Sequence, residues 1–160
     1  MRRNLIPRRE PGQALILVAL TLGILVTFAV VGKEVAYQRR SLARVQNSVD
    51  MAVLAGLRVI EPVSLAQNDP RLDTLAASDI VRITLRQQLR RVSGALSDNS
   101  DAVAGSVQVS ILGPGGNCQG RPPATGPAIC AELSFGIRSL LGERRYTYET
   151  FAQSTDNLQP

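Results

Sequence analysis

The chain has 160 residues, 44% of them hydrophobic, and its 18 Lys and Arg outnumber its 13 Asp and Glu for a net charge of +5. This length suits one ordinary domain with an appended segment and excludes a large multidomain enzyme. Histidine is absent, which excludes a Ser-His-Asp or Cys-His mechanism and a zinc site with histidine ligands. The carboxylates are scattered along the chain, and no nucleophile has an evident base. We therefore expect neither enzymatic activity nor a metal or other cofactor.

The first predicted element is a membrane-spanning helix over residues 13–32, preceded by a basic N-terminus over residues 1–12. Residues 14–32 carry no charge. At about 1.5 Å per residue they extend roughly 28 Å, close to the hydrocarbon thickness of a bilayer. Their apolar side chains surround the whole helix, as expected for a helix in contact with lipid.

Basic residues flank this helix on both sides, so charge alone indicates its orientation only weakly. The apolar stretch is longer than the core of a usual signal peptide, which favours a retained anchor over the alternative of a cleaved signal. We expect a single-pass protein of the inner (cytoplasmic) membrane, with a cytoplasmic N-terminus and an extracytoplasmic C-terminal domain. The orientation rests on the two cysteines described below, because disulfides form in oxidising compartments.

The same helix is predicted to continue as a stalk over residues 33–60, since no helix breaker other than Gly56 precedes Pro62. Apolar or small residues recur there in a seven-residue pattern that defines a packing seam. The members of the seam are Val35, Leu42, Val45, Val49, Ala52, Gly56 and Val59. Such a seam identifies a packed face but not its partner, so the chain's own domain and a helix of another subunit both stay open. Gln46 and Asp50 have the spacing of a hydrogen-bonded helical pair.

Two motifs in this long helix resemble the TadE/TadG-like proteins of tight-adherence (Flp-type) pilus systems. Residues 12–17 (Gly-Gln-Ala-Leu-Ile-Leu) open the apolar helix as in that family, and residues 45–56 (Val-Gln-Asn-Ser-Val-Asp-Met-Ala-Val-Leu-Ala-Gly) resemble its second signature. The resemblance covers about residues 8–60. The positions that carry the second signature are Gln46, Asp50, Ala55 and Gly56.

The resemblance implies a membrane-anchored structural component of pilus assembly, or a minor pilin or pseudopilin-like subunit of a tight-adherence or type IV-related system. The implied partners are the lipid bilayer and, through the long helix, other pilin-like or pilus-assembly subunits. Both incorporation into a surface filament and a role confined to the membrane stay open. A prepilin-type cleavage between Gly12 and Gln13 would place Leu17 at the fifth mature position, where TadE relatives carry Glu. This difference argues against processing at that bond.

Residues 61–77 are predicted to form a turn-rich connector, in which Asp69 and Pro70 could start a helix. The extracytoplasmic module then spans residues 78–160 and opens with a helix over residues 78–96. The apolar face of this helix is formed by Val81, Leu85, Leu89, Val92 and Leu96. Arg82, Arg86 and Arg90 form a second ridge, which we interpret as a solvated face rather than a site for phospholipid or nucleic acid. We expect no nucleic-acid partner, because no aromatic residue lies between these arginines for base stacking.

Alternating apolar and polar residues then predict three short antiparallel strands over residues 103–111, 129–137 and 144–152. Gly142 and Glu143 are expected to form a tight turn between the last two strands. Three such strands can bury one face against the preceding helix. The sequence therefore predicts an α+β fold of pilin-like proportions, with a long N-terminal helix followed by a helix packed on a small three-stranded antiparallel sheet.

Residues 113–127, between the first two strands, contain nine Gly or Pro among fifteen residues. Such a loop has little apolar surface with which to order itself. Cys118 and Cys130 bracket its second half, and we expect them to form a disulfide, with two free structural thiols as the alternative. Cys130 alternates with the apolar residues of its strand and is expected to point away from the core.

A second class of function stays open beside the pilus hypothesis. A generic single-pass, membrane-tethered binding or sensor subunit would use either the Gly/Pro-rich loop or the arginine ridge as its contact surface. Neither function requires catalytic chemistry.

Overall fold

The computed structural model describes residues 11–59, 74–119, 121–140 and 142–153, and the chain divides into two units, residues 1–37 and 38–160. The elements in chain order are α1 (Pro11–Leu57), α3 (Thr74–Arg90), the 3₁₀ turn η1 (Ser93–Ala95), α4 (Ser100–Gly105), β1 (Gln108–Leu112), β2 (Ala128–Ile137) and β3 (Arg144–Gln153). A long N-terminal helix thus precedes a further helix and a three-stranded antiparallel sheet, so the predicted α+β fold is confirmed.

The described part of the first unit is the N-terminal portion of α1. It contains an 18-residue window with a mean hydropathy of 2.8, none of which is buried, so the helix is long and apolar enough to cross a membrane. The hydroxyls of Thr21 and Thr27 donate hydrogen bonds to the carbonyl oxygens of Val18 and Gly23, at 2.9 and 2.8 Å. Both hydroxyls are therefore satisfied within the helix, which matters in lipid, where water is absent.

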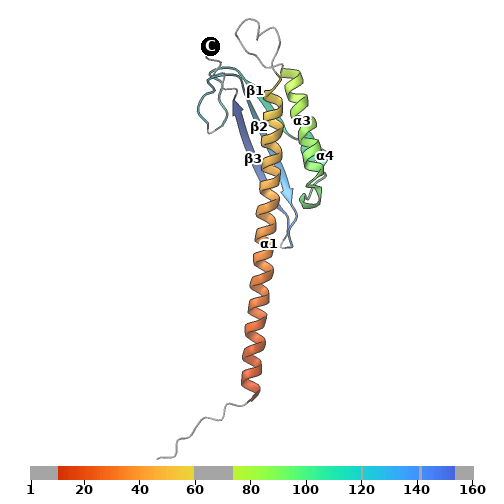
Figure 1. Cartoon of the computed structure of the whole chain (residues 1–160), viewed down its shortest axis with the longest axis vertical. Coiled ribbons are helices and arrows are strands. Elements are labelled where there is room, and N and C mark those ends of the chain that lie inside the picture. The colour runs from red at the N-terminus through yellow and green to blue at the C-terminus, as the bar shows by residue number, and fades with distance from the viewer. Residues whose placement is uncertain (1–10, 60–73, 120, 141, 154–160) are drawn as a thin grey trace, which may run out of the picture. The chain divides into compact units, whose positions relative to one another are not determined.

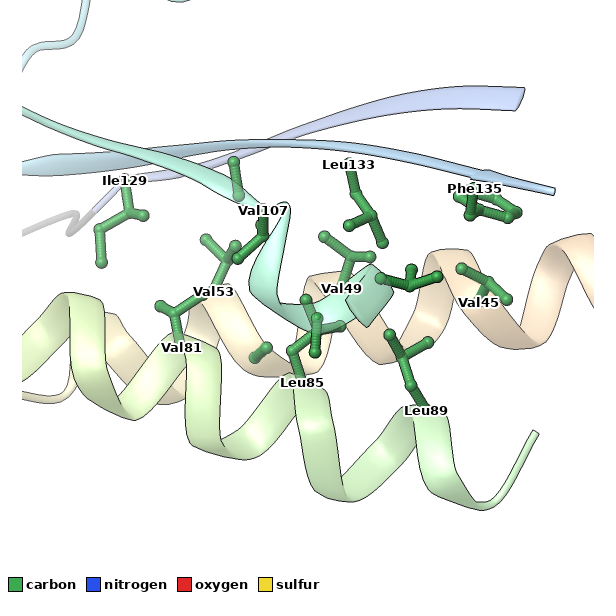
Figure 2. Close-up of a cluster of buried hydrophobic side chains, with 14 of the residues drawn as sticks. Val45, Val49, Val53, Val81, Leu85, Leu89, Val107, Ile129, Leu133 and Phe135 are labelled. Atoms are coloured by element: carbon green, nitrogen blue, oxygen red, sulfur yellow. The ribbon is translucent and has the colours of Figure 1, made fainter. Parts of the chain in front are cut away.

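In the second unit, helices cover one face of an antiparallel sheet in the order β1-β2-β3. Figure 1 shows α3 running beside the C-terminal part of α1, with the strands of the sheet passing behind α1. Figure 2 shows Val45, Val49 and Val53 of α1, together with side chains of α3, pointing toward Ile129 and Leu133 of β2. These residues belong to one buried cluster, which is the hydrophobic core of the unit. This layering buries both the apolar faces of the helices and the apolar side of the sheet.

The packing seam of α1 lies largely against the chain's own module. Val45, Val49, Ala52 and Gly56 are buried, and Leu42 and Val59 are partly buried against the same core. Val35 is 42% exposed, so the prediction that it belongs to this packed face is not met within the chain. The sequence pattern also missed part of the buried face, namely Ser41, Ser48, Val53 and Leu57. A helix that contacts both a sheet and a second helix buries a wider face than the narrow stripe of a coiled coil.

Several boundaries differ from the sequence-based expectation. α1 ends at Leu57 and α3 begins at Thr74, so the last residues assigned to the connector belong to α3; the rest of the predicted connector, with Asp69 and Pro70, lies outside the described residues. α3 ends at Arg90, and the predicted continuation to Leu96 is a turn that contains η1. Leu96 is buried and forms an isolated β-bridge with Ile137. A bridge to the sheet requires extended backbone, which ends the helical pattern before Leu96.

The predicted first strand is wrong over its first half, where the chain forms α4. The Asn99 side chain accepts a hydrogen bond from the backbone N–H of Asp101 at 2.9 Å and thereby caps this short helix. Val103 and Ala104 are buried, but they belong to this helix and not to a strand. β1 therefore begins only at Gln108.

The second and third strands are confirmed with small changes at their ends. β2 and β3 pair over ten residues each, from Ala128 opposite Gln153 to Ile137 opposite Arg144. Gly142 lies between them with a φ of +117°, a conformation that residues with a side chain rarely adopt. The Gly142 N–H donates to the Ser139 carbonyl oxygen at 3.1 Å, so the turn ends at Gly142 and lies earlier than the predicted turn of Gly142 and Glu143.

Gly56 permits close packing of α1 against its neighbours. A Cβ atom at this position would lie 2.6 Å from Val81 Cγ2 of α3 and 3.0 Å from Ile129 Cδ1 of β2. We predict that Gly56→Ala lowers the free energy of unfolding by about 1–2 kcal/mol, because overpacking costs more than the gain in helix propensity. Chemical unfolding of the chain in neutral detergent measures this change.

Gly105→Ala is the matched control, because an added Cβ at the end of α4 meets nothing within 4 Å. This variant should be neutral or slightly stabilising. Equal effects at both positions would show that Gly56 does not set the packing of α1.

Candidate functional site

The candidate functional features lie on the two faces of β3. The residues of this strand alternate between the side that faces α1 and the side that faces away from it. Tyr148 and Thr150 face the helix, whereas Glu149 faces the opposite side. The helix-facing residues contact the Asp50 carboxylate, and the outward-facing Glu149 contacts the cysteine pair.

Cys118 and Cys130 form a disulfide, with their Cα atoms 6.0 Å apart. Cys130 lies on β2 on the same face as exposed Glu132 and Ser134, so its predicted orientation away from the core is confirmed. Cys118 is almost fully buried, at 2% exposure. The bridge therefore holds the Gly/Pro-rich loop against the outer face of the sheet.

The loop is more ordered than its composition predicts. The Gly115 N–H donates to the Ala124 carbonyl oxygen at 2.7 Å, and the Ala124 N–H donates to the Gly116 carbonyl oxygen at 2.8 Å. The Thr125 hydroxyl is hydrogen-bonded to the Gln153 amide at the end of β3. These bonds join the two arms of the loop to each other and to the sheet, which the count of Gly and Pro could not reveal.

Glu149 places a carboxylate beside the disulfide. Its Oε1 atom lies 3.1 Å from Cys118 Sγ and 3.5 Å from Cys130 Sγ. Among the described residues, the potential metal ligands of these three side chains lie within 4.8 Å of one another. Both sulfurs are consumed by the disulfide, so only the carboxylate is an anionic ligand in this state, and metal ions require deprotonated thiolates from cysteine.

Asp50 connects α1 to β3 through two hydroxyl groups. The Tyr148 hydroxyl lies 3.1 and 3.2 Å from the two carboxylate oxygens, and the Thr150 hydroxyl donates to Oδ1 at 2.5 Å. The predicted pairing of Asp50 with Gln46 is therefore replaced by contacts with residues about a hundred positions away in the chain. Charge-assisted hydrogen bonds of this kind are stronger than neutral ones.

Burial raises the pKa of Tyr148, and the hydrogen bond and charge of Asp50 raise it further. A proton on the phenol is needed for the bond to the carboxylate, so the folded protein keeps this group neutral beyond its ordinary pKa. Asp50 and Tyr148 thus act as acceptor and donor of a structural contact. Their arrangement fixes the position of α1 along β3.

The signature positions have different surroundings. Gly56 is buried against α3 and β2, Asp50 binds β3, and Gln46 and Ala55 are half-buried. Gly12 and Gln13, the positions of the potential processing site, lie in the first turn of α1 and are exposed.

The arginine ridge has an acidic partner within the chain. Arg90 donates to both carboxylate oxygens of Asp101 at 3.2 Å, and Arg86 Nε lies 3.7 Å from Asp101 Oδ1. The hydrogen bond from Arg90 is the main cause that lowers the pKa of Asp101. All three side chains are well exposed, so these pairs contribute little to stability. This arrangement agrees with the interpretation of the ridge as a solvated face.

No family model matches this sequence, and neither curated proteins nor solved structures show a significant match to it.

We predict that Asp50→Ala lowers the free energy of unfolding by about 2 kcal/mol, because it removes the acceptor of two partly buried hydroxyls. Tyr148→Phe should cost about 1 kcal/mol, and the double variant should cost less than the sum of the two. Asn47→Ala, an exposed position one turn earlier on α1, is the control and should change stability by less than about 0.5 kcal/mol. Strictly additive effects in chemical unfolding would contradict the contact.

Proposed function

We propose that this chain is a membrane-anchored structural component of pilus assembly, acting as a minor pilin or pseudopilin-like subunit of a tight-adherence or type IV-related system. The observation that carries the proposal is the composition of α1. One continuous helix supplies both an exposed apolar segment suited to lipid and, further along, the face that completes the core of an α+β module.

The surroundings of two signature positions support the resemblance to TadE/TadG-like proteins. At Gly56, any larger residue would meet the side chains of Val81 and Ile129. At Asp50, the carboxylate accepts hydrogen bonds from Tyr148 and Thr150. Packing of this part of α1 on the sheet therefore explains both the glycine and the aspartate of the second signature.

The proposed location is the inner membrane, with the N-terminus in the cytoplasm and the module outside. The Cys118–Cys130 disulfide supports this orientation, because such bonds persist in oxidising compartments. The arginines at positions 2, 3, 8 and 9 would then lie on the cytoplasmic side, where positive residues are favoured.

The proposed partners are other pilin-like or pilus-assembly subunits, which would contact the outer face of α1. Since Val45, Val49 and Ala52 pack on the chain's own core, that face is not available to another subunit. The opposite side of the helix carries exposed Met51 and Leu54. Another subunit that binds this part of α1 would therefore contact Met51 and Leu54 rather than the seam.

A membrane-tethered binding or sensor subunit is the second candidate. The loop residues 113–119 and 121–127 favour it, because the disulfide and the hydrogen bonds of Ala124 with Gly115 and Gly116 hold a Gly/Pro-rich surface in place on the sheet. Positioned loops on a rigid scaffold are common binding surfaces.

We predict that Leu22→Arg weakens retention in the membrane, because a charge at the centre of a spanning helix costs about 2.5–3.5 kcal/mol on the insertion scale. The native chain should resist extraction by alkaline carbonate, and the variant should appear in the extract or be degraded. Leu140→Arg, at an 81% exposed position outside α1, should leave retention unchanged. Recovery of the native chain as a soluble form that lacks the apolar segment would contradict the retained anchor.

The pilus function is tested by deleting the gene in its native host and comparing filaments sheared from the cell surface with the membrane fraction. Deletion should abolish or strongly reduce surface filaments, and the native chain should restore them. Complementation with Leu22→Arg should fail, whereas complementation with Leu140→Arg should succeed. Normal filament number and composition in the deletion strain would contradict the proposal and favour the tethered binding subunit.

A further inference from the structure

The Cys118–Cys130 disulfide lies in contact with the Glu149 carboxylate. Glu149 Oε1 is 3.1 Å from Cys118 Sγ and 3.5 Å from Cys130 Sγ. A disulfide sulfur carries no hydrogen, so neither sulfur donates a hydrogen bond to this oxygen. The negative charge of Glu149 therefore rests directly against both atoms of a bond that can be opened only by a nucleophile.

The two sulfurs differ in access. Cys118 is 2% exposed, whereas Cys130 is half-buried on the outer face of β2. An incoming thiolate must approach in line with the S–S bond and reach the accessible sulfur first. Attack therefore occurs at Cys130 Sγ, and Cys118 becomes the leaving group.

We propose that Glu149 makes this disulfide resistant to anionic thiols and selective for cationic ones. In the exchange, the thiolate RS⁻ forms a bond to Cys130 Sγ, the S–S bond breaks, and its electron pair leaves on Cys118 Sγ. A second thiolate then attacks the mixed disulfide, which yields RSSR and the Cys130 thiolate, and both cysteine thiolates take protons from water. Negative charge thus approaches Cys130 and develops at Cys118, in each case beside the Glu149 carboxylate.

Other charges near the disulfide could also affect the relative rates of cationic and anionic thiols. Glu132 is the cross-strand neighbour of Glu149 on the same sheet face and is exposed. Arg121 lies in the loop three residues after Cys118, and its backbone N–H bonds the Cys118 carbonyl oxygen at 3.0 Å. The chain as a whole carries a net charge of +5, which by itself would attract anionic thiols. A preference for cationic thiols therefore reports the local carboxylate and not the overall field.

The consequence concerns the loop over residues 113–127. Because anionic small thiols open the bridge slowly, the loop stays anchored to β2 in their presence. A reductant with positive charge near its reactive sulfur opens the bridge faster and releases the Cys118 arm. This inference does not rest on the proposed pilus function and holds equally for a tethered binding subunit.

The test is the rate of disulfide reduction in the full chain, purified in neutral detergent at low ionic strength. Cysteamine (cationic) and 2-mercaptoethanesulfonate (anionic) are compared at equal thiolate concentration, and the opened bridge is measured by alkylation and mass. For the native chain, the cationic thiol should react roughly five- to tenfold faster. In Glu149→Gln this ratio should fall to about twofold or less, since the local charge is removed.

Glu132→Gln is the matched control, because it removes one carboxylate from the same face without a contact to either sulfur. Its rate ratio should fall by much less than that of Glu149→Gln, because this exposed carboxylate contacts neither sulfur. Since each ratio compares two thiols on the same protein, a loss of stability in a variant changes both rates together. Equal ratios in the native chain and Glu149→Gln would overturn the proposal, as would an equal loss of selectivity in both variants.

A measurement on the unmodified chain keeps the test valid if Glu149→Gln does not fold. Raising the salt to about 0.5 M shortens the screening length to about 4–5 Å, so the native ratio should fall to less than half its low-salt value. A ratio that is insensitive to salt, or that favours the anionic thiol at low salt, would overturn the proposal.

Discussion

The burial of one face of α1 is the interaction on which the rest of the structure depends. Val45, Val49 and Val53 fill the space between α3 and β2, and each is fully buried. Without this helix, the sheet and α3 would expose the apolar side of β2 to water. A small module of this size has no second core to compensate. The α+β module is therefore completed by the same helix that supplies the candidate membrane anchor.

Two specific contacts fix where α1 lies on the sheet. Gly56 allows the helix backbone to approach Val81 and Ile129, and the Asp50 carboxylate accepts hydrogen bonds from Tyr148 and Thr150. Apolar packing alone tolerates sliding by a helical turn, because many apolar residues are interchangeable in a core. A close-contact glycine and a directional hydrogen-bonded pair do not. The following residue, Glu149, faces the other side of β3, so neighbouring residues of one strand contact the helix and the disulfide.

The sequence predicted those parts of the fold that follow from local periodicity. β2 and β3 alternate clearly, and the outward position of Cys130 followed from that alternation together with its pairing to Cys118. α4 was missed because Val103 fits an alternating pattern and a helical one equally well; Asn99 was the available signal, since asparagine favours helix caps. The seam was identified at Val45, Val49, Ala52 and Gly56, but its seven-residue period was too narrow for a helix that contacts two elements. The partners of Asp50 and the contact of Glu149 with the disulfide depend on strand register, which no local pattern contains.

The central claim, that α1 closes the core of its own module, is tested most directly by amide hydrogen exchange on the full chain in neutral nanodiscs. We expect residues 45–57 to exchange as slowly as β2 and α3, because opening them requires unfolding of the whole module. This protection should be unchanged when the protein is diluted tenfold. Protection of residues 45–57 that is much weaker than that of β2, or that disappears on dilution, would contradict the account and assign this face of α1 to contacts between subunits.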